Sequence, residues 1–416
     1  MNPLRVGIIA GESSGDQLGA ALITAMRAKA PDVQFFGMAG PKMIAAGCEA
    51  WEASEEIAVM GLAEVLLHLP RLLRLRSSLV ARFRKARPHV FVGIDSPAFN
   101  LPVAKQLRSA ECKTVQYVAP QVWAWRQGRV RKIGRACDLV LCLLPFEPKF
   151  FEDHGVPAVF VGHPLADQIP LELDRMAARR DLGIAVPVVD PGASAASTVV
   201  PRRAAGASRD SLRCAPVAES ALIALLPGSR LGEVERLGSD FVRAAAWIAG
   251  RRPHIQFAAP MASPRVRHTF EKKIAEVPNA PRITLFDGQS HRVLAAADAA
   301  LVASGTATLE TLLSRRPMVV AYRFGAVTAF VVRALGLVKV RFFSQPNILV
   351  GRRLVPEFLQ EQVSGPALGE ALLQVLDDQN LQAEMQHEFR TVHEILRRGG
   401  ADRAASAILE RVRGHA

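Results

Sequence analysis

The sequence predicts an α/β protein with two doubly wound domains, each built on a parallel sheet. Short β-rich runs alternate with helical stretches in the first half of the chain, and the same alternation restarts after residue 220. A stretch without regular periodicity separates the two series. With 416 residues, 50% of them hydrophobic, the chain is long enough to bury two large cores.

Strands are predicted where apolar and β-branched residues are bounded by turn residues. In the first half they are Val6–Ala10, Val33–Met38, Val90–Ile94, Lys113–Val118, Leu139–Leu144 and Ala158–Val161. In the second half they are Leu222–Leu226, Ile255–Ala259, Ile283–Phe286, Ala299–Ala303 and Met318–Tyr322. Because helical stretches connect them, we expect the strands to pair in parallel.

Residues 185–220 are rich in Ala, Pro, Ser, Gly and Arg and follow neither a period of 2 nor one of 3.6, which predicts a flexible insertion. It separates an N-terminal domain, 1–184, from a C-terminal domain, 221–378. Residues 379–416 are predicted to form amphipathic helices that pack back toward the N-terminal domain. Ligands of such domains bind at the carboxyl ends of the strands, so we expect a site in a cleft between the two.

The net charge of +13 is concentrated in residues 71–87, which carry seven basic residues and no acidic one. This indicates an anionic partner. Nucleic acid is not favoured, because aromatic residues make up only 6% and no nucleic-acid-binding signature is present. An apolar stretch directly precedes the basic one, which favours an anionic membrane surface. Its candidate residues are Met60, Leu62, Leu66, Leu69, Leu73, Arg74 and Arg76. The alternative is a pair of core helices with a solvated arginine face.

Five scattered cysteines without Cys-x-x-Cys spacing are typical of reduced thiols. The chain enters its first strand without a signal-peptide pattern, and no apolar run reaches the roughly 18 residues of a spanning helix. We therefore expect a cytoplasmic protein that is soluble or peripheral to a membrane and is not exported.

Two glycine-containing turns in the second half are suited to a nucleotide diphosphate. One contains Gly228, Ser229 and Arg230, and the other Ser304, Gly305 and Thr306. Each links a strand to a helix, where free backbone N–H groups can meet phosphate oxygens. Glu310 follows Thr306 by one helical turn, where its carboxylate could accept from both ribose hydroxyls. The alternative for either turn is ordinary helix capping.

In the first half, Asp95 directly follows an apolar strand and is a candidate general base. It could instead cap the next helix. The first strand ends in a loop that could hold a phosphate or a sugar, although any tight turn has this composition. Its candidate residues are Gly11, Glu12, Ser13, Gly15 and Asp16.

Three further residues are open to both a functional and a structural interpretation. Trp123 and Trp125 stand beside a basic series, which suits a sugar face or a lipid contact, but also aromatic core packing. His163 is either a second acid/base group or a turn residue. No cluster has metal-ligand spacing, so we expect no metal and no cofactor, and a leaving diphosphate would be stabilised by arginine and helix termini.

With these segments in place, the chain resembles the lipid-A-disaccharide synthase family, the bacterial glycosyltransferases of lipid A assembly. The similar segments are 10–16, 39–41, 58–61, 91–95, 122–126, 226–230, 303–306 and 346–347. The resemblance implies a GT-B architecture, in which two Rossmann-like domains face each other across a cleft. It also implies a metal-independent, inverting transfer.

The donor implied by this resemblance is UDP-2,3-diacylglucosamine, and the acceptor is 2,3-diacylglucosamine 1-phosphate, whose 6-hydroxyl attacks to give a β-1,6-linked disaccharide and UDP. By motif, Asp95 is the essential carboxylate, Arg230 and the 304–306 turn hold the diphosphate, Glu310 holds the ribose, and Asn347 lies near the donor. Both lipid substrates lie at the inner membrane face, so the resemblance implies a cytoplasmic protein associated peripherally with an anionic inner-membrane surface. A homodimer is left open, and the insertion is longer than we expect for the family.

Two other classes compete with this reading. A UDP-sugar epimerase, or another GT-B transferase of the UDP-GlcNAc type, would need the same nucleotide turn but no apolar, basic surface. A non-catalytic nucleotide-sugar or lipid-binding protein would not need Asp95.

Overall fold

The computed structural model describes residues 3–57, 62–109, 111–123, 127–184, 221–325 and 341–414, without the side chains of residues 12, 13, 62–68 and 127. The predicted insertion 185–220, Met60 and Trp125 lie outside this description. The described chain divides into two compact units. Unit 1 holds the residues up to Gln168, Arg341 and those from Val392 onward, and unit 2 holds the rest.

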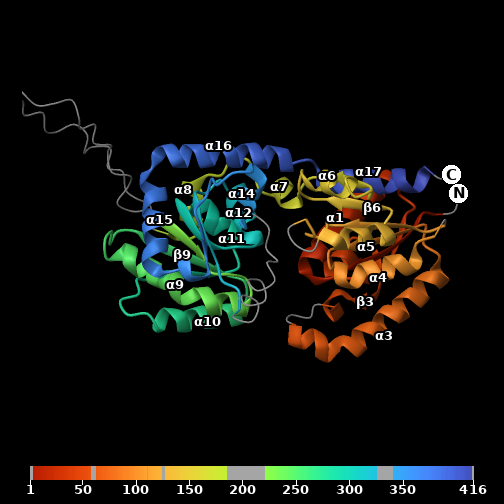
Figure 1. The fold of residues 1–416 in the computed structure, drawn as a ribbon, viewed down its shortest axis with the longest axis horizontal. Helices are drawn as coiled ribbons and strands as arrows, with labels where there is room; N and C mark the ends of the chain where they lie inside the picture. Colours follow the sequence, from red (N-terminus) through yellow and green to blue (C-terminus); the bar gives the residue numbers. More distant parts are fainter. Residues whose placement is uncertain are drawn as a thin grey trace, which may run out of the picture. The chain divides into compact units, whose positions relative to one another are not determined.

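Unit 1 is built on a seven-stranded parallel sheet of order β3-β2-β1-β4-β5-β6-β7. Its strands are β1 (Arg5–Ala10), β2 (Gln34–Ala39), β3 (Cys48–Ala53), β4 (Val90–Ile94), β5 (Lys113–Tyr117), β6 (Leu139–Cys142) and β7 (Ala158–Phe160). Its helices are α1 (Glu12–Lys29), α2 (Pro41–Ala45), η1 (Ser54–Ile57), α3 (Leu62–Ala86), α4 (Pro97–Leu107), η2 (Gln127–Arg129), α5 (Val130–Ala136), α6 (Glu147–Glu152), α7 (Pro164–Gln168) and α17 (Gly400–Arg413) (Figure 1).

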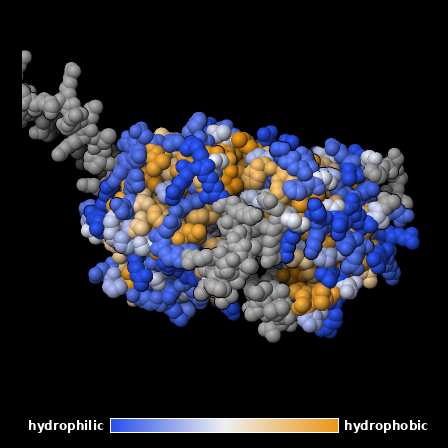
Figure 2. All heavy atoms as spheres, viewed as in Figure 1, coloured by the Kyte–Doolittle hydropathy of each residue, from blue (hydrophilic) through white to orange (hydrophobic). Residues whose placement is uncertain are grey.

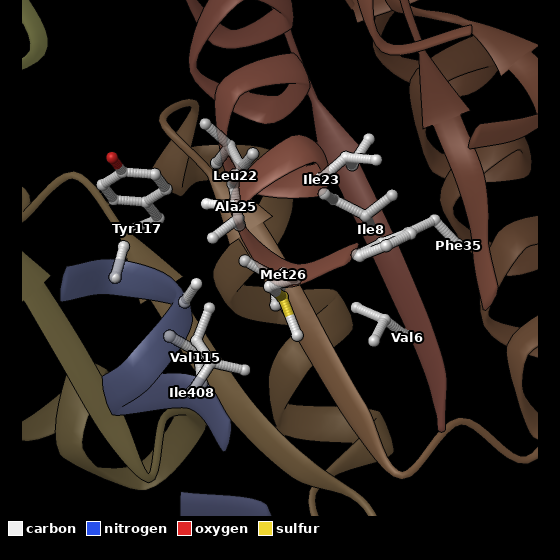
Figure 3. Packing of buried hydrophobic residues seen from close by; sticks show 14 of the residues in the cluster. Val6, Ile8, Leu22, Ile23, Ala25, Met26, Phe35, Val115, Tyr117 and Ile408 are labelled. Atoms are coloured by element: carbon white, nitrogen blue, oxygen red, sulfur yellow. The ribbon is translucent and has the colours of Figure 1, made fainter. Parts of the chain in front are cut away.

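Two hydrophobic cores cover the two faces of this sheet. On one face α1 and α17 pack against β1 and β5, with Met26, Tyr117 and Ile408 fully buried; Figure 3 shows these side chains as members of one cluster. On the other face α3, α4 and α5 cover a second cluster that includes Phe83 of α3 and Phe91 of β4. The central strands are therefore apolar on both sides, as parallel sheets require.

Unit 2 is built on a six-stranded parallel sheet of order β10-β9-β8-β11-β12-β13. Its strands are β8 (Leu222–Leu226), β9 (Gln256–Met261), β10 (Ile283–Asp287), β11 (Ala299–Ala303), β12 (Met318–Tyr322) and β13 (Glu357–Leu359). Its helices are α8 (Arg175–Asp181), α9 (Leu231–Ala249), α10 (Pro264–Ala275), α11 (Ser290–Ala296), α12 (Thr306–Leu313), α14 (Gln345–Val350), η3 (Gln360–Gln362) and α15 (Gly365–Asp377). Helix α16 (Gln379–Leu396) begins in unit 2 and ends in unit 1.

The predicted fold class, two doubly wound α/β units, is confirmed. Every predicted strand is present, with bounds that differ by at most two residues. Two edge strands, β3 and β13, were not predicted. The predicted C-terminal helical stretch is present as α16 and α17, and α17 packs against α1.

Candidate active site

The candidate residues gather where the strand order of each sheet reverses. In unit 1 this point lies between β1 and β4, and in unit 2 between β8 and β11. Doubly wound sheets bind their ligands at the carboxyl ends of the strands at such a switch point. The turns that contain Gly11, Asp95, Gly228 and Gly305 each follow one of these four strands. The predicted turns thus lie at the switch points that the strand order of the two sheets defines.

The two turns of unit 1 touch each other. A Cβ atom on Gly11 would lie 2.5 Å from Ser96 Oγ and 2.7 Å from Ile57 Cδ1. Only glycine fits this position without movement of its neighbours. The loop after β1 therefore lies directly against the residue that follows Asp95.

Asp95 stands in an unusual backbone conformation. Its φ is +50°, the φ of Ser96 is +39°, and that of Val118, just beyond β5, is +74°. Left-handed backbone is uncommon outside glycine and is a marked outlier for a β-branched residue. Each such residue costs on the order of 1–3 kcal/mol and persists only where the surroundings hold it. The N-cap residue of α4 is Ser96, so Asp95 lies one residue outside the cap.

Two buried amide side chains hold this turn. Asn100 Nδ2 donates to the carbonyl oxygens of Ile94 and Asp95 at 3.1 and 2.8 Å, and Gln116 Nε2 donates to Asp95 O at 3.0 Å. The sequence analysis did not identify either residue. A signal was available, because Gln116 is a polar side chain in the middle of a buried apolar strand.

Asp16 has a structural role within unit 1. Its buried carboxylate accepts from the backbone N–H groups of Lys42 and Met43, both at 2.9 Å, at the first turn of α2. It lies against Gly40, where a Cβ atom would be 2.4 Å from Asp16 Cγ. Of the predicted loop, Gly15 packs on Ala10, and the side chains of Glu12 and Ser13 are outside the description.

In unit 2 the first turn presents an exposed Ser229 and Arg230 at the start of α9. Gly228 has φ +130°, and a Cβ atom there would lie 2.4 Å from Glu233 Cβ. Glu233 Oε2 accepts from the N–H groups of Ser229 and Arg230, at 3.1 and 3.4 Å. These are the amides that were expected to meet phosphate, so a diphosphate would use them only if Glu233 moves.

The second turn is more open. Gly305 has φ +153° with no atom near the position of a Cβ, and Thr306 is exposed. Ser304 Oγ donates to Phe343 O at 3.0 Å, which ties the turn to the segment before α14. The half-buried Glu310 accepts from Ser290 Oγ at 3.1 Å.

Asn347 is fully buried and its amide is engaged within unit 2. Its Oδ1 accepts from the N–H groups of Leu354 and Val355 at 2.7 and 2.9 Å, and its Nδ2 donates to Val355 O at 3.0 Å. Both polar atoms of the Asn347 side chain therefore bind backbone groups of unit 2, whereas the family resemblance implied a position near the sugar-nucleotide donor. Any effect of Asn347 on a donor would run through the segment after α14.

His163 and Trp123 are accounted for by local packing. His163 Nδ1 accepts from the N–H of Leu165 at 3.2 Å at the start of α7, and loss of hydration, partly offset by Asp167, lowers the pKa of His163 to about 4. Trp123 Nε1 donates to Glu147 at 3.2 Å. Burial raises the pKa of Glu147 to about 7, although hydrogen bonds from Leu144 and Trp123 oppose the shift.

The expected membrane surface lies on α3. Leu69 and Leu73 are 42% and 40% exposed, Arg74 is exposed and Arg76 is half-buried, whereas Leu79 and Phe83 further along are fully buried. Figure 2 shows hydrophobic residues on the surface along this helix. The helix thus combines a packed second half with exposed leucines in the first. The side chains of Leu62 and Leu66 are outside the description.

None of the helices in the described ranges is long and apolar enough to cross a membrane. No group of three or more His, Cys, Asp or Glu side chains in that part of the chain could hold a metal ion.

Solved structures share the fold at low sequence identity. The glycotransferase of kitacinnamycin superposes with a TM-score of 0.56 at 16% identity, covering 99% of this chain and 100% of that one. A UDP-GlcNAc 2-epimerase from Neisseria meningitidis bound to UDP-GlcNAc gives 0.57 at 12% identity, with the same coverage. At these identities the likeness describes the fold alone.

Sequence comparison is more specific. The family model described as lipid-A-disaccharide synthetase matches residues 6–188 and 199–411, and the gap falls inside the predicted insertion. A lipid-A-disaccharide synthase of Alkalilimnicola ehrlichii is 45% identical over 412 residues, 99% of this chain and 100% of the relative. One of Pseudomonas syringae pv. tomato is 46% identical over 408 residues, 98% and 97% of the two chains. The chain therefore belongs to the lipid-A-disaccharide synthase family of glycosyltransferases.

Proposed function

We propose that this enzyme condenses UDP-2,3-diacylglucosamine with 2,3-diacylglucosamine 1-phosphate to form the β-1,6-linked lipid A disaccharide 1-phosphate and UDP. The observation that carries the proposal is the match to curated lipid-A-disaccharide synthases along nearly the whole chain. Substrates of this kind, a UDP-sugar and a sugar phosphate, follow from the family. The epimerase alternative rests on a likeness of fold only.

In the proposed reaction Asp95 acts as the general base. Its carboxylate accepts the proton of the acceptor 6-hydroxyl while that oxygen forms a bond to the anomeric carbon of the donor. The bond between this carbon and the diphosphate oxygen breaks, and UDP leaves. Attack opposite the leaving group inverts the anomeric configuration. The position of Asp95 at the switch point of unit 1 supports this role.

Unit 2 is proposed to bind the donor and to stabilise the leaving diphosphate. Arg230 provides a fixed positive charge beside the start of α9, and the open turn at Ser304, Gly305 and Thr306 allows close approach of phosphate to backbone. Glu310 is proposed to bind the ribose. With charge supplied in this way, transfer needs no bound metal, and activity is expected to persist in EDTA.

We further propose that the exposed leucines and arginines of α3 bring the enzyme to an anionic membrane surface. Both substrates carry acyl chains, so an enzyme that works at the membrane face meets them where they are concentrated. The alternation of exposed Leu69 and Leu73 with exposed Arg71 and Arg74 supports this location.

The experiment is an assay of UDP release with purified protein and both acylated substrates. UDP release is expected only when the acylated acceptor is present, whereas turnover of a water-soluble UDP-sugar alone would indicate an epimerase. Asp95→Asn is expected to lower kcat by about a thousandfold or more while UDP still binds, because a base acts on the acceptor. Asp153→Asn, at an exposed aspartate, is the control. A fully active Asp95→Asn enzyme would remove Asp95 from the role of base.

A further inference from the structure

We propose that Asn100 and Gln116 are positioning residues: together they hold the backbone at Asp95 in the left-handed conformation that aims its carboxylate. The inference rests on the proposed role of Asp95 as the base. It concerns side chains that need not touch either substrate.

The geometry that supports it is a pair of amide donors directed at one carbonyl oxygen. Asp95 O accepts from Asn100 Nδ2 at 2.8 Å and from Gln116 Nε2 at 3.0 Å. Gln116 Nε2 also lies 3.3 Å from Tyr117 O and 3.4 Å from Val118 O, so one amide joins the ends of β4 and β5. With both donors in place, the peptide plane after Asp95 cannot rotate without breaking two buried hydrogen bonds.

Asn100 and Gln116 occupy buried positions that apolar side chains would ordinarily fill. Asn100 and Gln116 are 0% and 1% exposed, and a Cβ atom on Gly93 would lie 2.8 Å from Asn100 Cβ and 3.2 Å from Gln116 Oε1. Gly93 therefore makes the room that the two amides occupy. Asn100 Oδ1 is buried and has no hydrogen-bond partner among the described residues. An unpartnered buried acceptor destabilises a fold, so packing alone does not explain an asparagine here.

Two of the hydrogen bonds of Gln116 are made to residues whose backbone is strained. Asp95, Ser96 and Val118 all have positive φ, and the carbonyl groups of Asp95 and Val118 are both bonded by Gln116. A general base must lie within hydrogen-bond reach of the hydroxyl whose proton it takes. A misplacement of about 1 Å costs on the order of 100-fold in rate, so a rigid turn at this residue has a direct catalytic effect.

The test compares Gln116→Met with Thr114→Val. Methionine keeps the length of the side chain but removes its donor. Thr114 is equally buried two residues earlier on β5 and binds Ala136 O and Asp138 at the opposite end of the strand, so its loss is a matched structural control. We expect Gln116→Met to lower kcat by about 10- to 100-fold with KM for both substrates within about twofold. Thr114→Val should lower the melting temperature while leaving kcat within about twofold. Equal losses of kcat in the two variants would overturn the inference.

Ser96→Gly provides a second test, because glycine adopts left-handed backbone without strain and the turn then needs less support from the two amides. If the amides hold the turn against this strain, Gln116→Met should lower kcat less in the Ser96→Gly background than in the wild-type background. An equal loss of kcat in both backgrounds would contradict the proposal.

A double mutant separates this inference from the proposed function. If the amides act through Asp95, adding Gln116→Met to Asp95→Asn should lower kcat no further, because the effects of coupled residues are not additive. Multiplicative losses would overturn the inference and leave Asp95 as the base. A fully active Asp95→Asn enzyme would instead remove Asp95 from the proposed role of base.

Discussion

At the scale of single residues, Glu310 gives a direct test of donor binding. It lies on α12 one turn after Thr306 and accepts a hydrogen bond from Ser290 Oγ. Ribose hydroxyls would add to or replace this bond. Glu310→Ala is expected to weaken UDP binding by about 1–3 kcal/mol, or about 5- to 150-fold, as for other hydrogen bonds to charged groups. Calorimetric titration with UDP measures this, and Ser290→Ala, which keeps the carboxylate, should stay within about threefold. Unchanged affinity in Glu310→Ala would assign the ribose to other residues.

His163 predicts a pH dependence of stability. Its pKa is about 4 in the folded protein against 6.5 normally, so the fold favours the neutral ring. The associated stability is fully present above pH 6.5 and is lost as the pH falls from 6.5 to about 4, on the order of 2–3 kcal/mol. His163→Asn keeps an acceptor for the N–H of Leu165 but does not titrate. It should lose less stability than the wild type between pH 7.5 and 4.

Denaturant unfolding at several pH values measures this difference. His154→Asn is the control, because His154 is exposed; its Nδ1 contacts the backbone carbonyl of Phe150, and its ring lies against the Phe150 ring. Parallel pH curves for wild type and His163→Asn would contradict the prediction.

The sequence indicated which turns follow the central strands better than it indicated which partners their side chains bind. Asp95 and Gly305 could be found because small or acidic residues after apolar strands mark the carboxyl end of a sheet. Asn347 and Asp16 have the same polar character, but their side chains bind backbone groups inside their own units. Which partner a polar side chain finds depends on tertiary contacts. For the same reason Glu233, which binds the amides of the first donor turn, was not identified.

At the scale of elements, the buried strands were predictable and the edge strands were not. The central strands are nearly continuous apolar runs because helices cover both of their faces. β3 has the sequence Cys-Glu-Ala-Trp-Glu-Ala and is mostly exposed or half-buried, and β13 is only three residues long. Strands of this kind are formed by pairing with a neighbour rather than by their own hydrophobic pattern.

Helix α3 carries the element-scale prediction of membrane binding. Leu69→Ser with Leu73→Ser removes exposed apolar surface without entering the core, so binding to vesicles that contain anionic lipid should weaken by about 10- to 100-fold. Cosedimentation measures the bound fraction. The control is Ile44→Ser with Val159→Ser, at similarly exposed apolar residues on other elements of unit 1. Equal binding by the two double variants would show that α3 has no special part in it.

At the scale of the whole molecule, unit 1 is completed by distant parts of the chain: the residues up to Gln168 are joined by Arg341 and by the residues from Val392 onward. Its last helix, α17, completes the core under β1 and β5, with Ala404 and Ile408 fully buried. The family match spans both units but omits residues 189–198. The residues that flank the predicted insertion are anchored within unit 2, since Ile184 and Ala221 are buried, and α8 and β8 both bind Asp298 through Arg179 and the N–H of Leu222.

These anchors predict that the middle of the insertion can be removed. Deletion of residues 189–198 should leave the melting temperature within about 2 °C and kcat/KM within about twofold, because a change of this size in the length of a flexible connection alters loop-closure entropy by only about half a kcal/mol. Thermal unfolding and the UDP-release assay measure the two quantities on the same protein. Replacement of the ten residues by a glycine-serine segment of equal length is the control for length. A deletion variant that folds but has no turnover, together with an active replacement variant, would show that catalysis requires the length of this connection. Loss of turnover in both variants would show that catalysis requires its sequence.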